Sequence, residues 1–415
     1  MPDKMKKYWF YLSKDVFISF DKQHRMLLYS TKSGNYLISS GILCVELVKE
    51  VYDPKNLGVV ELNTKYLTNN ESNDFIEEIQ RLKLGDKMVK IPDQPKPINL
   101  LPILNLQNDV EKLLINGEQF LIGEGISEYL TCINIYINSN CSQKCRLCHH
   151  YYLQTRSCSK SEPDVTLPLM TIGQILSQAS VTQTRHINIL GGNILLYPEW
   201  NELMQLFKSS NFEYHLWINY QNINSTEKLK HLPFQKELLI TFPFKEAMVC
   251  ELISLCETDN NITLNFLIED ISQLVTVNKL LAGNSRIRAN IIPIFNGENR
   301  GFFEQNVFLN LEDILAEKQE MRNIFCNQKL NANYFGGLNI LADGSVKASM
   351  NTTPVGRFPK NSLLELVYNE LIQNTAWRKV RDNETCRGCL FQYLCPPPGN
   401  YEHSLGKPDM CNVES

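Results

Sequence analysis

The chain has 415 residues, of which 43% are hydrophobic and 21% charged, and its formal net charge is −4. This composition excludes wholesale disorder and a collagen-like structure, and the near-balanced charge argues against a nucleic-acid partner. A chain of this length favours two or three domains. No run approaches the roughly 20 apolar residues of a membrane span, and the first residues lack the apolar core of a signal peptide. We therefore expect a soluble, cytoplasmic protein.

Residues 1–90 predict a small α+β domain. Short runs of β-branched and aromatic residues indicate strands, and two apolar patterns with helical spacing indicate helices. Asn69 and Ser72 are suited to cap the second helix, and Gly85 is expected to stop it just after Leu84. In chain order we expect strands at 9–11, 16–20, 25–29 and 36–38, a helix at 41–51, a strand at 57–62 and a helix from about 69 to 84.

A proline-rich segment follows this domain, with four prolines between residues 91 and 105. Proline at that density stiffens the chain and blocks helices, so we expect a linker over 91–117.

From residue 118 to about 300, strand-like and helix-like patterns alternate. This alternation predicts right-handed crossovers and a parallel sheet, whose active-site residues lie on loops after the carboxyl ends of the strands. Six units predict a partial (β/α)6 barrel, smaller than the full eight-stranded barrel. The expected strands are 129–138, 186–190, 212–219, 237–243, 261–268 and 287–295, and the expected helices include 170–179, 200–207, 245–256 and 271–281.

Thirteen cysteines are present, and seven of them fall into two groups. In a reducing compartment, clustered cysteines indicate metal or redox chemistry. Cys141, Cys145 and Cys148 form a C-x3-C-x2-C pattern directly after the first barrel strand. Three thiolates on one loop are suited to hold three irons of a [4Fe–4S] cluster, and the fourth iron is then open to an exchangeable ligand. We take most of the six other cysteines to be small buried residues.

Two other interpretations of this loop are open. Residues 145–149 also fit the C-x-x-C-H pattern of a c-type haem attachment, a chemistry that usually needs export. A zinc site that uses His149 or His150 is the second alternative, because these ligand types suit zinc.

The cysteine loop after the first strand of a six-fold β/α unit resembles the radical S-adenosylmethionine superfamily. The resemblance implies that the open iron binds S-adenosylmethionine. The family usually has an aromatic residue near the adenine where this chain has Leu147, and Tyr151 or Tyr152 would have to compensate. It also has a Gly-Gly-Glu turn that contacts the amino group of the cofactor, and here that turn is Gly191-Gly192-Asn193.

The second cysteine group, Cys386, Cys389, Cys395 and Cys411, is suited to hold a closed iron–sulfur cluster or a zinc ion. It resembles the SPASM domain of radical enzymes that modify peptides, here over residues 301–415, and implies the outer auxiliary cluster of that domain. The cysteines of the inner cluster are replaced by Gly399 and Ser349. We therefore expect one auxiliary cluster, an orphan structural Cys326, and a Ser349 oxygen ligand only as an unusual alternative.

Residues 1–90 resemble the winged-helix peptide-recognition element of ribosomal peptide maturases. The resemblance implies that a leader peptide adds a strand to the 59–62 edge and lies against the helix at 74–82. A small domain that only packs on the barrel is the alternative.

The whole chain resembles the Bacteroidales peptide maturases whose precursors have Gly-Gly leaders, a family with pseudo-enzyme members. This implies an enzyme that uses a 5′-deoxyadenosyl radical to abstract hydrogen from a precursor peptide, leading to a crosslink, a thioether or an epimerised residue. A flavodoxin or ferredoxin would supply the electron, and a paired maturase is a further expected partner. The alternative is a catalytically degenerate partner that binds the leader peptide and presents it to another maturase.

Overall fold

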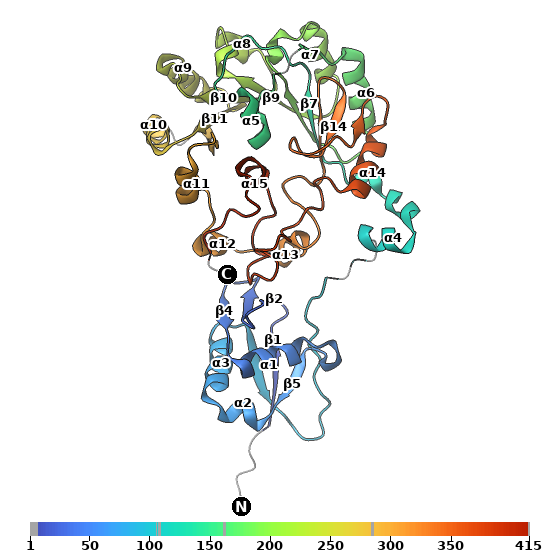
Figure 1. Ribbon diagram of the computed structural model, residues 1–415, viewed down its shortest axis with the longest axis vertical. Coiled ribbons are helices and arrows are strands. Elements are labelled where there is room, and N and C mark those ends of the chain that lie inside the picture. Colours follow the sequence, from blue (N-terminus) through green and yellow to red (C-terminus); the bar gives the residue numbers. More distant parts are fainter. Residues whose placement is uncertain (1–6, 105, 107–108, 161–162, 284–285, 414–415) are drawn as a thin grey trace, which may run out of the picture.

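The computed structural model describes residues 7–104, 106, 109–160, 163–283 and 286–413 (Figure 1). A nine-stranded sheet in the order β12-β11-β10-β9-β8-β7-β13-β14-β15 forms the centre of the larger part of the chain. The strands from β7 to β12 run parallel and coincide with the six predicted runs, so the parallel α/β organisation is confirmed. Its closure into a partial barrel stays a prediction. The bounds are β7 Cys132–Tyr136, β8 His186–Leu190, β9 Glu213–Asn219, β10 Gln235–Thr241, β11 Ile262–Ile268 and β12 Arg288–Pro293.

Helices cover one face of this sheet, on the outside of the larger lobe in Figure 1. Along β9, Tyr214, Leu216 and Ile218 belong to the main apolar core, whereas His215 and Trp217 alternate with them and point to the other face. The sheet thus has an apolar helix side and a polar inner side. The helices between the strands are α6 Leu169–Ala179, α7 Trp200–Lys208, α8 Glu227–Lys230, α9 Glu246–Cys256 and α10 Ile271–Leu281, and four of them match the predicted patterns.

The C-terminal segment extends the same sheet. Its strand β13 (Gly337–Ile340) pairs in parallel with β7, and β14 (Ser345–Lys347) and β15 (Gly356–Arg357) follow as antiparallel strands. These three short strands were not predicted. The remaining helices are α4 Val110–Asn116, α5 Cys148–Gln154, α11 Arg300–Asn306, α12 Leu311–Ala316, α13 Met321–Asn327, α14 Leu363–Gln373 and α15 Asn400–Leu405. No helix among the described residues combines the length and apolarity needed to cross a membrane.

Two three-stranded antiparallel sheets and three helices make up the N-terminal part, which has its own apolar core. One sheet has the order β5-β1-β6 and the other β2-β3-β4. The bounds are β1 Tyr8–Leu12, β2 Val16–Phe20, β3 Met26–Ser30, β4 Tyr36–Ser39, α1 Ile42–Tyr52, β5 Val59–Leu62, α2 Thr64–Thr68, α3 Asn70–Arg81 and β6 Gly85–Val89.

The end of α3 differs from the prediction. Asn69 caps the helix as expected, accepting a hydrogen bond from the Ser72 N–H at 3.0 Å, but Gly85 does not stop it. The left-handed residue after the helix is Lys83, with φ of 59°. Gly85 instead begins β6, where an added Cβ would lie 2.4 Å from the Tyr11 carbonyl oxygen. Glycine is therefore required by the close approach of two strands.

The proline-rich segment has no helix or strand from residue 90 to 104, but helix α4, Val110–Asn116, lies within the 91–117 stretch that was expected to be a linker. The four prolines all precede α4, so they do not block it. The segment is held to the N-terminal part at Asn99, whose N–H donates to the Leu57 carbonyl at 2.9 Å. Residues 105, 107 and 108 of the expected linker lie outside the described residues.

The β2-β3-β4 sheet packs on the C-terminal segment. Phe17, Leu27 and Tyr29 share one buried apolar cluster with side chains of α12, α13 and residues 390–395. Tyr29 is fully buried, and its hydroxyl accepts a hydrogen bond from the Gln319 backbone N–H at 2.8 Å. The N-terminal part is therefore attached directly to the region that carries the second cysteine group.

The change Tyr29→Phe tests this attachment. It leaves the Gln319 N–H without its acceptor, so we expect the free energy of unfolding to fall by about 1–3 kcal/mol in urea denaturation of the full chain. Tyr11→Phe is the matched control, since the Tyr11 hydroxyl makes no hydrogen bond within the described residues. Equal losses in the two variants would contradict a specific contribution from this contact.

Candidate active site

The loop after β7 brings Cys141, Cys145 and Cys148 together. Burial raises the pKa of Cys145 to about 11, and the neighbouring thiols of Cys148 and Cys141 add to the rise. Burial also raises the pKa of Cys148, again with Cys141 beside it. The three cysteines predicted from the sequence thus form one sheltered group at the carboxyl end of the first parallel strand.

The spacing of these sulfurs is wider than that of a preformed single-ion site. Among the described residues, the three-ligand groups whose atoms all lie within 4.8 Å of one another do not include a cysteine. Zinc bonds of 2.3 Å in a tetrahedron would place sulfurs only about 3.8 Å apart. Both cysteine groups are therefore more open than a zinc site, and no cysteine is in a disulfide.

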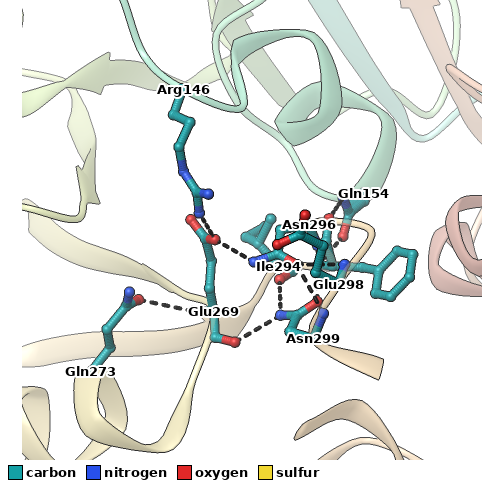
Figure 2. A network of polar contacts seen from close by, with 9 residues as sticks. Arg146, Gln154, Glu269, Gln273, Ile294, Asn296, Glu298 and Asn299 are labelled. Carbon is teal, nitrogen blue, oxygen red and sulfur yellow. Dashed lines mark hydrogen bonds and ion pairs between the residues drawn. The ribbon is translucent and has the colours of Figure 1, made fainter. Parts of the chain in front are cut away.

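A polar network fixes the cysteine loop to the ends of β11 and β12 (Figure 2). Arg146, between the second and third cysteines, pairs with the buried carboxylate of Glu269, which follows β11. The same carboxylate accepts a hydrogen bond from Asn296 Nδ2 at 2.7 Å, and the Glu269 carbonyl accepts one from Asn299 Nδ2 at 2.7 Å. Three segments far apart in the sequence are thereby tied together around one acid.

Glu269→Gln should loosen this loop. The substitution keeps the shape but removes the charge that strengthens the bonds from Arg146 and Asn296. We expect the free energy of unfolding to fall by about 1–2 kcal/mol, and the iron retained after anaerobic reconstitution to fall with it. Glu298→Gln, on the same turn, is the control, because the Glu298 side chain makes no hydrogen bond or ion pair within the described residues. Unchanged stability and iron content in Glu269→Gln would refute a positioning role.

The Gly191-Gly192 turn after β8 supports the same loop. Added Cβ atoms would lie 2.4 Å from Asn138 Oδ1 and 2.3 Å from the Asn140 carbonyl oxygen. The Gly192 N–H donates to the Asn138 carbonyl at 3.0 Å. In the structure these glycines allow the close approach of the backbone that leads into Cys141.

Asn193 is buried on this turn. Its side-chain oxygen accepts a hydrogen bond from the Leu195 N–H at 3.1 Å, which leaves one further acceptor position on that oxygen. Leu147 is also buried, in a small apolar cluster with Tyr151, Leu267 and Ile294. The predicted cofactor-binding residues thus surround the cysteine loop.

Cys158 is a residue that the sequence analysis did not single out. It is buried, and burial raises its pKa, with the thiols of Cys145, Cys148 and Cys141 raising it further. The Asn219 amide donates to the Cys145 sulfur at 3.7 Å. A fourth thiol therefore stands beside the three of the motif. No spacing pattern could have indicated it, because residues 149–157 intervene.

Asn222 is a second unpredicted residue near this group. It lies just after β9, next to Gln221, whose side-chain oxygen is 3.9 Å from the Cys145 sulfur. Both polar atoms of the Asn222 side chain are buried without a hydrogen-bond partner. Buried amides are almost always satisfied, so this side chain is available to a bound molecule.

A cavity of about 650 Å³ separates the inner side of the sheet from the C-terminal segment. Tyr136 at the end of β7 lines it, as does Tyr152 of α5, the helix that begins at Cys148, so the cavity lies next to the elements that carry the cysteine loop. The wall is mixed in character, with amides, aromatic rings and the guanidinium groups of Arg156 and Arg381. Its residues include Asn134, Tyr136, Tyr152, Arg156, Ser349, Gly399 and Asn400.

The region expected for an inner auxiliary cluster is filled by hydrogen bonds. Asn400 Oδ1 accepts bonds from the Tyr334 hydroxyl at 2.8 Å and from Asn351 Nδ2 at 3.0 Å. The Ser349 hydroxyl lies 3.5 Å from the same oxygen, and Ser349 and Gly399 both line the cavity. These side chains already bond one another and include no thiol, so they do not fit an inner cluster.

The structure brings the second cysteine group together. Cys386, Cys389, Cys395 and Cys411 all line one small cavity of about 40 Å³. Burial raises the pKa of Cys395 to about 12, and the Arg381 guanidinium beside it lowers that pKa in part. These four thiols lie near a cation, with Cys386 and Cys395 buried and Cys389 and Cys411 half-buried, which suits the negative charge of a thiolate-bound metal centre.

The predicted leader site combined the edge strand at 59–62 with the helix at 74–82, but in the structure these two elements lie at opposite edges of the β5-β1-β6 sheet. β5 is an edge strand, but α3 packs on β6 at the opposite edge, where Ile79 approaches Gly85. The strand linked to α3 is β4, since Asn35 Nδ2 donates to the Leu82 carbonyl at 3.0 Å. β4 has β3 on one side and no strand on the other within the described residues.

Three solved structures are similar to this chain in arrangement. Streptococcus suis SuiB bound to precursor peptide SuiA has a TM-score of 0.45 and 12% identity over 98% of this chain and 99% of that chain. SuiB bound to S-adenosylmethionine has a TM-score of 0.44 and 11% identity over 97% and 99%. Hexahistidine-tagged anSMEcpe with bound AdoMet has a TM-score of 0.44 and 14% identity over 64% and 84%. No protein-family model and no curated protein matches the sequence.

Proposed function

We propose that the chain is a radical S-adenosylmethionine enzyme that modifies a ribosomally made precursor peptide. The observation that carries this proposal is the group of Cys141, Cys145 and Cys148 at the carboxyl end of the first parallel strand, beside a cavity of about 650 Å³. Ligands usually bind at this end of a parallel sheet. A precursor peptide and S-adenosylmethionine, the ligands named for SuiB and anSMEcpe, are the ones proposed here.

The residues fit the cluster that this function needs. Cys141, Cys145 and Cys148 would hold it, and the buried Asn222 amide near this group has no hydrogen-bond partner. When bound, such a cluster supplies the electron that splits S-adenosylmethionine into methionine and a 5′-deoxyadenosyl radical. We expect a flavodoxin or ferredoxin to deliver that electron.

The residues of the chain itself fix the position of the cysteine loop and exclude water from the site. Glu269 and the two glycines of the β8 turn fix the loop, and the buried wall around Tyr136 excludes water. Tyr152 offers a ring for the adenine in place of the aromatic residue that Leu147 replaces. Arg156 offers a cation to a carboxylate in the cavity.

Peptide recognition is proposed for the N-terminal part. A leader strand would add to the free edge of β4, where main-chain hydrogen bonds supply affinity. Tyr36 and Ile38 of this strand are 40% and 37% exposed and would contact the leader side chains. The end of α3 lies beside the start of the same strand, so edge and helix form one site.

The outer auxiliary cluster is proposed at Cys386, Cys389, Cys395 and Cys411, and no inner one. It would brace the contact between the N-terminal part and the C-terminal segment, because Cys389 and Cys395 belong to that same apolar cluster. Zinc remains the alternative occupant of these four thiols.

The test is S-adenosylmethionine cleavage under anaerobic conditions. Full-length protein is reconstituted with iron and sulfide, reduced with dithionite, and assayed for 5′-deoxyadenosine by chromatography. With the precursor peptide present, we expect each chain to form several molecules of 5′-deoxyadenosine. Without the peptide, we expect about one molecule per chain. No 5′-deoxyadenosine from protein with a full iron content would refute the enzyme.

A second function is favoured by Cys158. If this fourth thiol completes the ligand set, the cluster is closed and S-adenosylmethionine has no iron to bind. The chain would then be a degenerate partner that binds the leader peptide and presents it to a paired maturase.

A further inference from the structure

A second group of metal-ligand side chains lies at the opposite end of the parallel sheet from the cysteine loop. His186 is the first residue of β8 and Glu213 the first residue of β9, and the two are paired in register. His215 follows two residues later on β9, on the same face as Glu213. All three project from neighbouring strands, which position side chains more rigidly than loops do.

The three side chains already point toward one another. His186 Nδ1 lies 2.9 Å from one Glu213 carboxylate oxygen, and His215 Nε2 lies 3.7 Å from the other. One ligand atom from each residue lies within 4.8 Å of the other two. A tetrahedral ion with bonds of about 2.1 Å needs ligand atoms about 3.4 Å apart, so small side-chain movements would complete the site.

The surrounding groups orient His215 as a ligand. Its Nδ1 lies 3.0 Å from Glu237 Oε1, and Glu237 Oε2 accepts a hydrogen bond from Asn265 Nδ2 at 3.0 Å. Asn265 Oδ1 in turn accepts from Asn290 Nδ2 at 2.9 Å. A carboxylate that accepts from one ring nitrogen leaves the other nitrogen free to bind a metal, the usual arrangement behind metal-bound histidines.

A bound cation would also balance the negative charges of the carboxylates around His215. Glu213 and Glu237 flank His215, and within the described residues neither carboxylate forms an ion pair with a lysine or arginine. Other acids of the sheet do have such partners, as in the Lys236–Asp259 pair at 2.8 Å. A divalent ion would offset both carboxylates at once.

We propose that His186, Glu213 and His215 bind one divalent transition-metal ion, Zn²⁺ foremost. Two imidazoles and one carboxylate suit Zn²⁺ or Fe²⁺ and disfavour Ca²⁺ and Mg²⁺, which prefer oxygen ligands. Three protein ligands leave a position for water or for a donor atom of a bound peptide. His186 pairs in register with Cys132, which lines the cavity, so that position lies on the cavity side of the sheet.

The test measures zinc binding to the full-length protein after its cysteine sites have been loaded with iron and sulfide. Calorimetric titration with Zn²⁺, with iron content checked before and after, should give one site in the wild type. His215→Ala should weaken it by at least about 100-fold, and Glu237→Gln by about 10–100-fold through loss of orientation. His231→Ala, an exposed histidine after α8, is the control and should bind as the wild type does.

The outcomes separate the metal site from a His215 ring that only contacts the carboxylates of Glu213 and Glu237. In that case, the wild type takes up no more zinc than His215→Ala, and the proposal fails. Should His215→Ala fold poorly by thermal melting, Glu213→Gln replaces it, because that side chain is 53% exposed and keeps its size. Undiminished zinc binding in Glu213→Gln would equally overturn the site.

Discussion

Cys145→Ala is expected to abolish cleavage of S-adenosylmethionine. Cys145 is the middle ligand of the proposed cluster and the one in contact with Asn219. Its removal leaves only two ligands of the motif on the loop. Because the cofactor rather than the protein supplies the chemistry, losing the cluster should stop the reaction. We expect 5′-deoxyadenosine formation to fall by roughly 10³-fold or more, which corresponds to about 4 kcal/mol in the barrier. Iron should fall from about eight to about four per chain, since only the outer cluster stays.

The control for this variant is Cys250→Ala. Cys250 is exposed on α9 and belongs to neither cysteine group, so its loss should change neither iron content nor cleavage. The pair therefore separates loss of a ligand from loss of any thiol. Full iron content together with undiminished cleavage in Cys145→Ala would contradict the assignment of the loop.

Cys395→Ala should have the second largest effect. Cys395 is buried, lines the four-thiol cavity and belongs to the apolar cluster that joins the N-terminal part to the C-terminal segment. Its removal breaks a closed ligand set, and closed metal sites contribute directly to folding. We expect iron to fall from about eight to about four per chain, the melting temperature to drop, and the N-terminal part to be cut faster by protease.

Cys326→Ala is the matched control for the auxiliary site. Cys326 is half-buried on α13, and it is the one cysteine left for an inner cluster. Since the Asn400 network occupies that region, this variant should keep its iron. A loss of about four irons in Cys326→Ala would show that an inner cluster exists after all.

Much of this architecture was predictable from local sequence. The six parallel strands were found because each is a continuous apolar run, and the covering helices because their apolar residues recur at helical spacing. The cysteine groups were found because Cys141, Cys145 and Cys148 are closely spaced, as are Cys386, Cys389 and Cys395. Cys411 was added as the distant cysteine that the family resemblance implies. β6 was missed because its sequence is mostly polar and exposed, and β13 because it has only four residues. Each is held by a distant partner, β1 and β7 respectively.

The surroundings of the site were less predictable. Glu269 reaches Arg146 across more than a hundred residues, and Cys158 joins the other thiols only because the chain after α5 returns to the β8 turn, where the Ser159 N–H donates to the Gly191 carbonyl at 2.8 Å. Gly191 and Gly192 were noted as a turn, but which backbone they admit depends on tertiary packing. The residues that orient the cysteines are thus brought together by the tertiary structure, and no local sequence pattern identifies them.

The central claim is an open iron at the Cys141, Cys145 and Cys148 loop, and electron paramagnetic resonance tests it most directly. Full-length protein would be reconstituted anaerobically, reduced with dithionite and measured with and without S-adenosylmethionine. We expect the signal of the reduced cluster to shift when S-adenosylmethionine is added, with 5′-deoxyadenosine forming on warming. A spectrum indifferent to S-adenosylmethionine in the wild type, with a shift appearing only in Cys158→Ala, would contradict the enzyme and identify a cluster closed by its fourth thiol.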